Sequence, residues 1–139
     1  MTNDRPVPTI WPCVLYEDAP AAIRFLVDAF GFQDALVVPG ETDGVVAHAE
    51  LLWPAGGGIM LGSTGRDDSP FAKMPTGAAS VYVVTDEPDA LFARATAAGA
   101  ELVRELRDED YGSRGFTVRD PEGNLWSFGT YRGTAPSDS

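Results

Sequence analysis

The sequence predicts an α+β fold made of two βαβββ modules that repeat one another. The order of one strand, one helix and three strands can be traced twice along the 139 residues. The helix starts align, because Asp18-Ala-Pro-Ala-Ala matches Asp86-Glu-Pro-Asp-Ala and a glycine follows each aspartate at the same distance. The prolyl turn and strand of residues 52–62 can also be laid over residues 119–129. Internal duplication explains this agreement better than helix-cap chemistry alone.

The first module is predicted at residues 8–65. It begins with a strand at residues 9–16, which are rich in β-branched and aromatic side chains. Asp18 is expected to cap a helix that carries apolar residues at helical spacing as far as Phe30, and Gly31 is expected to end it. Three further strands are expected at residues 35–39, 45–53 and 58–62.

The second module is predicted at residues 76–131 and repeats this order. A strand is expected at residues 79–85, followed by a helix that Asp86 caps and Gly99 ends. The remaining strands are expected at residues 100–106, 115–119 and 124–131. We interpret residues 66–75, with their Gly, Pro, Ser and Asp neighbours, as the linker, and residues 1–7 and 132–139 as flexible ends.

The composition limits the partners. With 10 Lys and Arg against 21 Asp and Glu, the net charge is −11, which excludes nucleic acid because phosphates need basic patches. The negative field favours a cationic small molecule, although acidity also simply keeps a protein in solution. No apolar run is long enough to cross a bilayer, and the N-terminus lacks the apolar core of a signal peptide. With a single cysteine and so no internal disulfide, we expect a cytoplasmic protein without a membrane partner.

Residues 118–126, Val-Arg-Asp-Pro-Glu-Gly-Asn-Leu-Trp, the paired helix starts and the two βαβββ units resemble the vicinal oxygen chelate superfamily. This superfamily includes glyoxalases, bleomycin-resistance proteins and extradiol dioxygenases. His48-Ala49-Glu50-Leu51 is similar to the matching segment of its PhnB-like branch. The resemblance implies curled mixed sheets around a central cavity with the helices outside. It also implies a homodimer, in which modules pair within a chain or between chains to close the cavity.

Enzymes of this superfamily hold a metal ion in the cavity with His or Glu side chains from the first and last strands of each module. The repeat places these positions at Trp11 (or Pro12, if the register shifts by one), Met60, Ser80 and Ser127. None is a usual ligand of a divalent cation, and one histidine and one cysteine are too few for a two-histidine site within one chain. A carboxylate-only Mg²⁺ or Ca²⁺ site stays open, but no spaced Asp/Glu motif builds one. We therefore expect no metal and no other cofactor.

An apolar, aromatic cavity with a few polar groups remains. Because side chains alternate along a strand, Ser127 shares its face with Leu125, whereas Trp126 and Phe128 face the helix. A flat ligand could stack on the cavity's aromatic and methionine side chains, or these could simply pack against one another. The ligand-binding residues expected from the strands are Trp11, Met60, Ser80, Tyr82 and Ser127.

Tyr111 and Arg114 complete the set of expected ligand-binding residues. They belong to the loop before the strand at residues 115–119, which borders the cavity in proteins of the family that the chain resembles. Arg114 either pairs with an anionic ligand or clamps Asp or Glu side chains at the joint between modules. Both alternatives stay open at this point.

His48 and Glu50 are candidate catalytic residues. They are two apart on a predicted strand and so share a face. A neutral histidine can exchange a proton near pH 7 while a carboxylate orients it, although the pair could equally form a polar sheet face or a dimer contact. Cys13 has no neighbouring base in the sequence, and we expect a buried, inert thiol there.

Two functions follow. The first is a metal-independent binding protein of the glyoxalase/bleomycin-resistance type, which sequesters a planar organic ligand and, given the acidity, a cationic one. The second is a lyase, isomerase or dioxygenase of the same superfamily with a displaced or metal-free site that uses His48 and Glu50.

Overall fold

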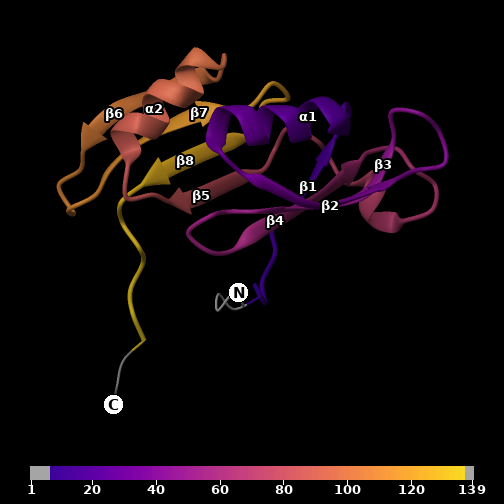
Figure 1. The fold of residues 1–139 in the computed structure, drawn as a ribbon, viewed down its shortest axis with the longest axis horizontal. Coiled ribbons are helices and arrows are strands. Elements are labelled where there is room, and N and C mark those ends of the chain that lie inside the picture. The colour runs from indigo at the N-terminus through magenta and orange to yellow at the C-terminus, as the bar shows by residue number, and fades with distance from the viewer. Residues whose placement is uncertain (1–6, 137–139) are drawn as a thin grey trace, which may run out of the picture.

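The computed structural model describes residues 7–136 and contains two four-stranded mixed sheets (Figure 1). Residues 1–6 and 137–139, part of the ends predicted to be flexible, lie outside the described residues. The first sheet has the strand order β1-β4-β3-β2, with β1 and β4 parallel and the other neighbours antiparallel. The elements of this half are β1 (Cys13–Tyr16), α1 (Ala19–Phe25), the π-helix η1 (Leu26–Phe30), β2 (Gln33–Pro39), β3 (Val46–Leu52) and β4 (Gly58–Ser63).

The second half repeats this topology. Its sheet has the order β5-β8-β7-β6, again with one parallel pair, between β5 and β8. The predicted α+β class and the twice-repeated βαβββ order are therefore confirmed. The elements are the 3-10 helix η2 (Pro70–Lys73) in the connection, then β5 (Ser80–Val84), α2 (Pro88–Ala97), β6 (Glu101–Asp108), β7 (Arg114–Arg119) and β8 (Leu125–Gly129).

The two helix starts are less alike than their sequences. Asp18 caps α1 as predicted, because its carboxylate accepts a hydrogen bond of 3.1 Å from the backbone N–H of Ala21. Asp86 does not cap α2. That helix begins one residue later relative to the repeat, at Pro88, and Asp86 instead forms an ion pair of 2.7 Å with Arg132. The glycine ends are confirmed, since Gly31 and Gly99 have φ of 92° and 96°.

The helices lie together on one face of both sheets and join the two halves (Figure 1). Arg94 of α2 donates hydrogen bonds of 2.9 and 3.1 Å to the backbone carbonyls of Asp28 and Val27 in η1. Beneath the helices, the ring of Phe30 lies 5.5 Å from that of Trp126 and 4.7 Å from that of Phe128. These aromatic contacts make one core that is shared by both halves.

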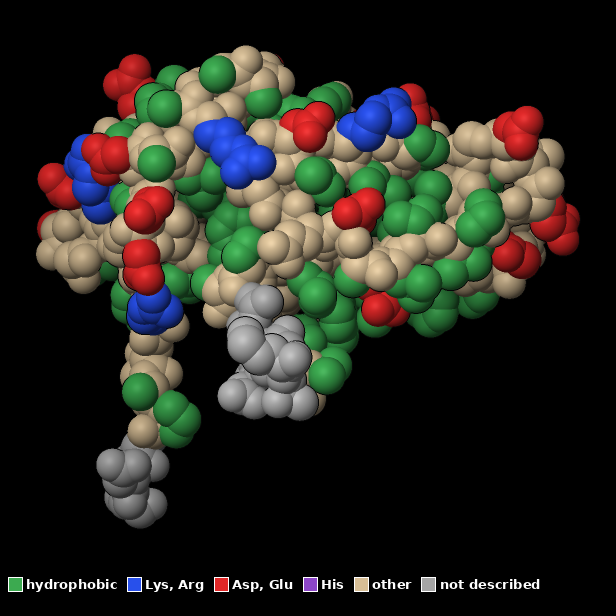
Figure 2. All heavy atoms as spheres, in the orientation of Figure 1, with side chains coloured by type: hydrophobic (Ala, Val, Ile, Leu, Met, Phe, Trp, Pro, Cys, Tyr) green, Lys and Arg blue, Asp and Glu red, His purple; other side chains and the backbone are tan. Residues whose placement is uncertain are grey.

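The opposite face of the two sheets is open. The outermost strands, β2 and β6, are exposed almost along their whole length, and the apolar side chains of Leu36 and Val38 on β2 reach solvent on this open face. Figure 2 shows hydrophobic side chains along the lower edge of the molecule, opposite the helices, with Asp and Glu between them. The expected central cavity enclosed by the sheets is therefore not formed by the single chain. Both helices join the same side of both sheets, so the two open faces do not close on each other.

Candidate functional site

A cavity of about 570 Å³ lies on the open face of the first sheet, where the connection between the two halves passes over it. The strands supply its floor. The parallel register of β1 and β4 sets Cys13 beside Met60 and Leu15 beside Gly62, all of which line the cavity. Their neighbours Val14 and Leu61 belong to the buried core and also border the cavity, so these two strands contribute to both.

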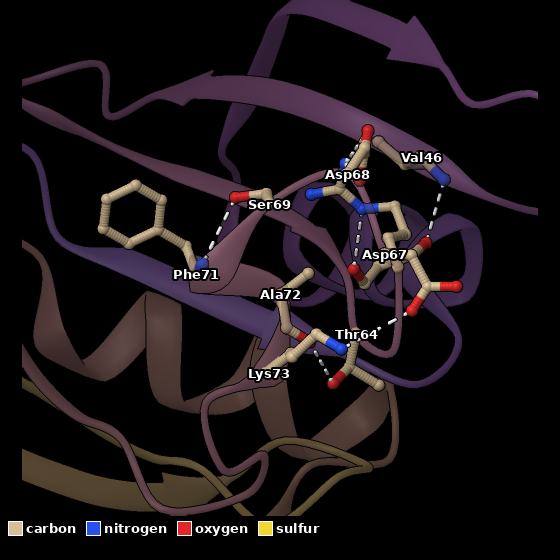
Figure 3. Close-up of polar contacts among 10 residues, drawn as sticks. Val46, Thr64, Asp67, Asp68, Ser69, Phe71, Ala72 and Lys73 are labelled. Carbon is tan, nitrogen blue, oxygen red and sulfur yellow. Dashed lines mark hydrogen bonds and ion pairs between the residues drawn. The ribbon is translucent and has the colours of Figure 1, made fainter.

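The connection forms the outer wall of the cavity. Ser69 begins η2 by accepting a hydrogen bond of 3.2 Å from the backbone N–H of Phe71 (Figure 3). Thr64 Oγ1 and the backbone N–H of Gly65 both donate to the carbonyl of Ala72, at 3.1 and 2.7 Å, and Ala72 is fully buried. This anchoring leaves Phe71 and Met74 at the cavity with 72% and 58% of their surfaces exposed.

Arg66 is the charged residue of this wall. Its Nε donates 3.0 Å to the carbonyl of Ser63, and its Nη1 bonds both oxygens of Asp68 at 3.0 and 3.1 Å. Only 17% of its side chain is exposed. Arg66, Phe71 and Met74 were not among the predicted site residues, because they lie in the segment interpreted as the linker. The apolar residues within that otherwise polar segment were the signal that could have indicated a wall.

His48 and Glu50 come together as their spacing predicts. Both lie on β3, His48 lines the cavity, and its Nε2 is 2.8 Å from Glu50 Oε2. The histidine is partly exposed, so its ring is accessible from the cavity. Such a pair can hold or move a proton beside a bound molecule.

The other predicted residues of the first sheet divide between the cavity and its surroundings. Met60 lines the cavity. Trp11 does not: its ring lies over Gly58, where a Cβ would approach Trp11 Cζ3 to 2.8 Å, and its Nε1 donates 3.1 Å to the carbonyl of Pro8. Cys13 is exposed and lines the cavity, so the expected buried thiol is wrong. β1 is an edge strand, so no strand pairs with it on the side away from β4.

Ser80, Tyr82 and Ser127 lie on the second sheet and are not among the residues that line this cavity. Tyr82 and Ser127 are register partners on adjacent strands. The Tyr82 hydroxyl donates 2.7 Å to the carbonyl of Tyr131, and partial burial raises the pKa of Tyr82. Ser127 Oγ and Thr117 Oγ1 share a hydrogen bond of 2.8 Å.

Arg114 is engaged by carboxylates. Its Nε and Nη2 bond the two oxygens of Asp89 at 2.9 and 3.2 Å, and its Nη1 lies 3.2 Å from Asp108. The hydrogen bonds from Arg114 lower the pKa of Asp89, and those carboxylates raise the pKa of Arg114. Arg114 therefore clamps carboxylates within the second module, between β7, β6 and the start of α2, and not at the joint between the modules. Tyr111 is exposed and its ring lies edge-on to Tyr131, at 5.9 Å.

The residues present do not fit the metal centre that the resemblance implies. The four assigned positions carry indole, thioether and hydroxyl groups, and the Ser127 hydroxyl is already paired with Thr117. Among residues 7–136, no group of three or more His, Cys, Asp or Glu side chains lies close enough to hold a metal ion. Nor does any helix in this part of the chain have the length and apolar character needed to cross a membrane.

Comparison with known proteins agrees with this architecture. The family model described as "Glyoxalase/Bleomycin resistance protein/Dioxygenase superfamily" matches residues 11–128. An uncharacterised protein of Mycobacterium bovis is 37% identical over 131 residues, which cover 88% of this chain and 82% of that protein.

Two solved structures are also similar. TioX from Micromonospora sp. ML1 is 34% identical with a TM-score of 0.75, covering 88% of this chain and 97% of TioX. A glyoxalase/bleomycin resistance protein from Streptomyces sp. CB03234 is 24% identical with a TM-score of 0.62, covering 84% and 94% of the two chains, and shares the fold. The chain therefore belongs to the glyoxalase/bleomycin resistance protein/dioxygenase superfamily.

Proposed function

We propose that the protein is a metal-independent binding protein that sequesters a planar organic molecule in the cavity beside β1 and β4. The observation that carries this proposal is the cavity itself. Its volume of about 570 Å³ falls within the range of about 300–1,000 Å³ that is typical of small-molecule sites. Leu15, Met60, Phe71 and Met74 give it apolar walls. Methionine and aromatic side chains adapt well to flat ligands.

Binding without a metal is supported by the residues at the positions where the superfamily's enzymes carry their ligands. Met60 is at the cavity, yet a thioether is a poor ligand for the hard or borderline cations that such enzymes use. Met60 instead offers a polarisable surface to an organic ring. At this position, the side chain would therefore pack against an organic ligand and would not coordinate a metal ion.

A thermal-shift screen of EDTA-treated protein, with planar organic compounds in one arm and divalent ions in the other, tests this function. A compound that binds only the folded state at a hundredfold excess over its Kd adds about 2.7 kcal/mol of stability. Phe71→Ala should reduce the shift, because Phe71 lines the cavity and is largely exposed. Ile10→Ala is the matched control, since Ile10 is an exposed apolar residue outside the cavity lining. A shift with ions alone would overturn the proposal.

A second candidate function is supported by the His48–Glu50 pair at 2.8 Å, because His48 borders the same cavity. A lyase or isomerase step that needs only proton transfer could use this pair without a metal. Turnover of a compound found in the screen, lost in His48→Ala while the compound still binds, would favour the enzyme. Binding without turnover in the unaltered protein would favour sequestration.

The open sheet faces support a homodimer. Leu36 and Val38 of β2 are exposed apolar side chains on the open face, and in the single chain nothing packs over them. We propose that a second copy covers these faces and deepens the cavity.

His48-Ala49-Glu50-Leu51 further supports membership of the PhnB-like branch. A cytoplasmic location completes the proposal, and fractionation of cells that express the tagged full chain tests it.

A further inference from the structure

The polar groups at the cavity are almost all engaged. Asn124 uses its amide oxygen to accept from the backbone N–H of Ala79 and its amide nitrogen to donate to Asp120, both at 3.0 Å. Ser69 Oγ accepts from Phe71, and His48 Nε2 is paired with Glu50. No Asp or Glu is among the described residues that line the cavity. A cation that entered the cavity would therefore meet no carboxylate on its walls.

Arg66 is the guanidinium among these groups, and one end of it is available. Its Nε and Nη1 are held by Ser63 and Asp68, whereas Nη2 has no hydrogen-bond partner within residues 7–136. Nη2 lies 3.5 Å from the place that a Cβ on Gly62 would occupy, and both residues line the cavity. The missing side chain at Gly62 leaves this nitrogen open to a ligand. The two fixed nitrogens hold the planar group in place, so binding need not order it.

Asp68 does not cancel the positive charge at this point. Its carboxylate is mostly exposed, so water screens its effect, whereas the Arg66 side chain is mostly buried. A charge-assisted hydrogen bond from a mostly buried guanidinium to a carboxylate is stronger than a neutral one.

We propose that the ligand class is an aromatic carboxylate whose apolar ring lies against Met60 and Phe71 and whose carboxylate accepts from Arg66 Nη2. This inference rests on the proposed binding function. It replaces the cationic ligand that the net charge of −11 favours, because the groups that line the cavity outweigh a diffuse field that salt screens.

Three matched probes test the proposal: naphthalene-2-carboxylate, naphthalene-2-carboxamide and 2-naphthylmethylammonium, titrated by NMR into the full chain. The carboxylate should bind most tightly and the ammonium least. Arg66→Gln should weaken the carboxylate by about tenfold, the loss of one charge-assisted hydrogen bond, and leave the carboxamide within about twofold. Asp68→Asn should tighten binding of the carboxylate, because it removes the negative charge that remains beside Arg66. Arg24→Gln, an exposed residue of α1 away from the cavity, should change nothing.

The outcomes separate the two levels of the proposal. Equal loss of all three probes in Arg66→Gln would mean that Arg66 only supports the wall and would overturn this inference, as would an ammonium that binds best. Binding of the probes with no preference for charge would overturn it as well, while leaving the binding function intact. Failure of every probe to bind the unaltered protein would overturn both.

Discussion

The hydroxyl of Tyr16, at the end of β1, donates a hydrogen bond of 2.7 Å to Oδ2 of Asp120, in the turn before β8. This contact joins the two halves of the chain inside the core. Asn124 Nδ2 and Trp126 Nε1 also donate to Oδ2, each at 3.0 Å, and two backbone N–H groups donate to Oδ1. A buried carboxylate without a cation is tolerated here because five donors surround it.

Tyr16→Phe should lower the free energy of unfolding by about 1.5–3 kcal/mol at pH 7, the range for a hydrogen bond to a charged group. Urea unfolding measures this change. Tyr111→Phe is the control, since Tyr111 is exposed and its hydroxyl makes no hydrogen bond within the described residues. An effect of Tyr16→Phe no larger than that of the control would show that the Tyr16–Asp120 bond does not stabilise the joint.

Alkaline pH should weaken the fold through the same tyrosine. Burial, and then the charge of Asp120, raise the pKa of Tyr16 far above its ordinary value of 10.0. The unfolded chain therefore releases this proton near pH 10 while the folded chain keeps it, so the stabilisation is complete below pH 10 and is lost as the pH rises. Between pH 10 and 11 the slope of stability against pH should be more negative in the unaltered protein than in Tyr16→Phe, by about 1.4 kcal/mol per pH unit at the limit. Identical slopes would contradict this assignment.

Glu122 should also couple the halves. Its Oε1 and Oε2 accept from the backbone N–H groups of Glu17 and Asp18, at 2.7 and 2.9 Å, just before α1. Glu122→Gln keeps one acceptor oxygen but places its amide NH₂, a donor, opposite the second backbone N–H. We therefore expect the free energy of unfolding to fall by about 1–3 kcal/mol, as measured by chemical denaturation. Glu105→Gln, an exposed residue of β6, should lie within about 0.5 kcal/mol of the unaltered protein. Equal stability of both variants would rule out this coupling.

The proposed homodimer predicts a difference between neighbouring positions on β2. Leu36 is register partner of Glu50 and lies on the open face, whereas Val37 is partner of buried Ala49 and points to the other side. Their exposed fractions are 45% and 44%. Leu36→Asp should give a monomer in sedimentation equilibrium at concentrations where Val37→Asp remains a dimer, because a charge would be buried only in the first. A monomeric unaltered protein would exclude the dimer.

The sequence predicted the features that repeat along the chain. Alternation placed Trp126 and Phe128 toward the helices, where both are fully buried, and placed His48 and Glu50 on one face. The glycines at the helix ends were also predictable. The chain adopts a left-handed backbone conformation where the first helical segment ends, and glycine, here Gly31, is the residue that favours it. Such features are local in sequence, so spacing alone reveals them.

Contacts between distant segments were beyond this reasoning. The connection places Arg66 and Phe71 over the first sheet, held by hydrogen bonds to the carbonyls of Ser63 and Ala72. The spacing of residues in the sequence does not indicate that this segment folds back onto the sheet. From the sequence, Arg114 could pair either with an anionic ligand or with protein carboxylates, and only the fold shows that Asp89 lies beside it. The sequence also left open whether the modules of one chain close the central cavity, because the relative placement of two modules depends on which faces of their helices pack together.

Backbone amide mapping by ¹H–¹⁵N NMR, with EDTA-treated protein and naphthalene-2-carboxylate, tests metal-independent binding in the cavity most directly. Binding should shift the amides of Met60, Gly62, Phe71 and Met74, which line the cavity, and leave those of β6 unchanged, with no divalent ion present. Shifts that appear only after a divalent ion is added, or that gather on the second sheet instead, would contradict it.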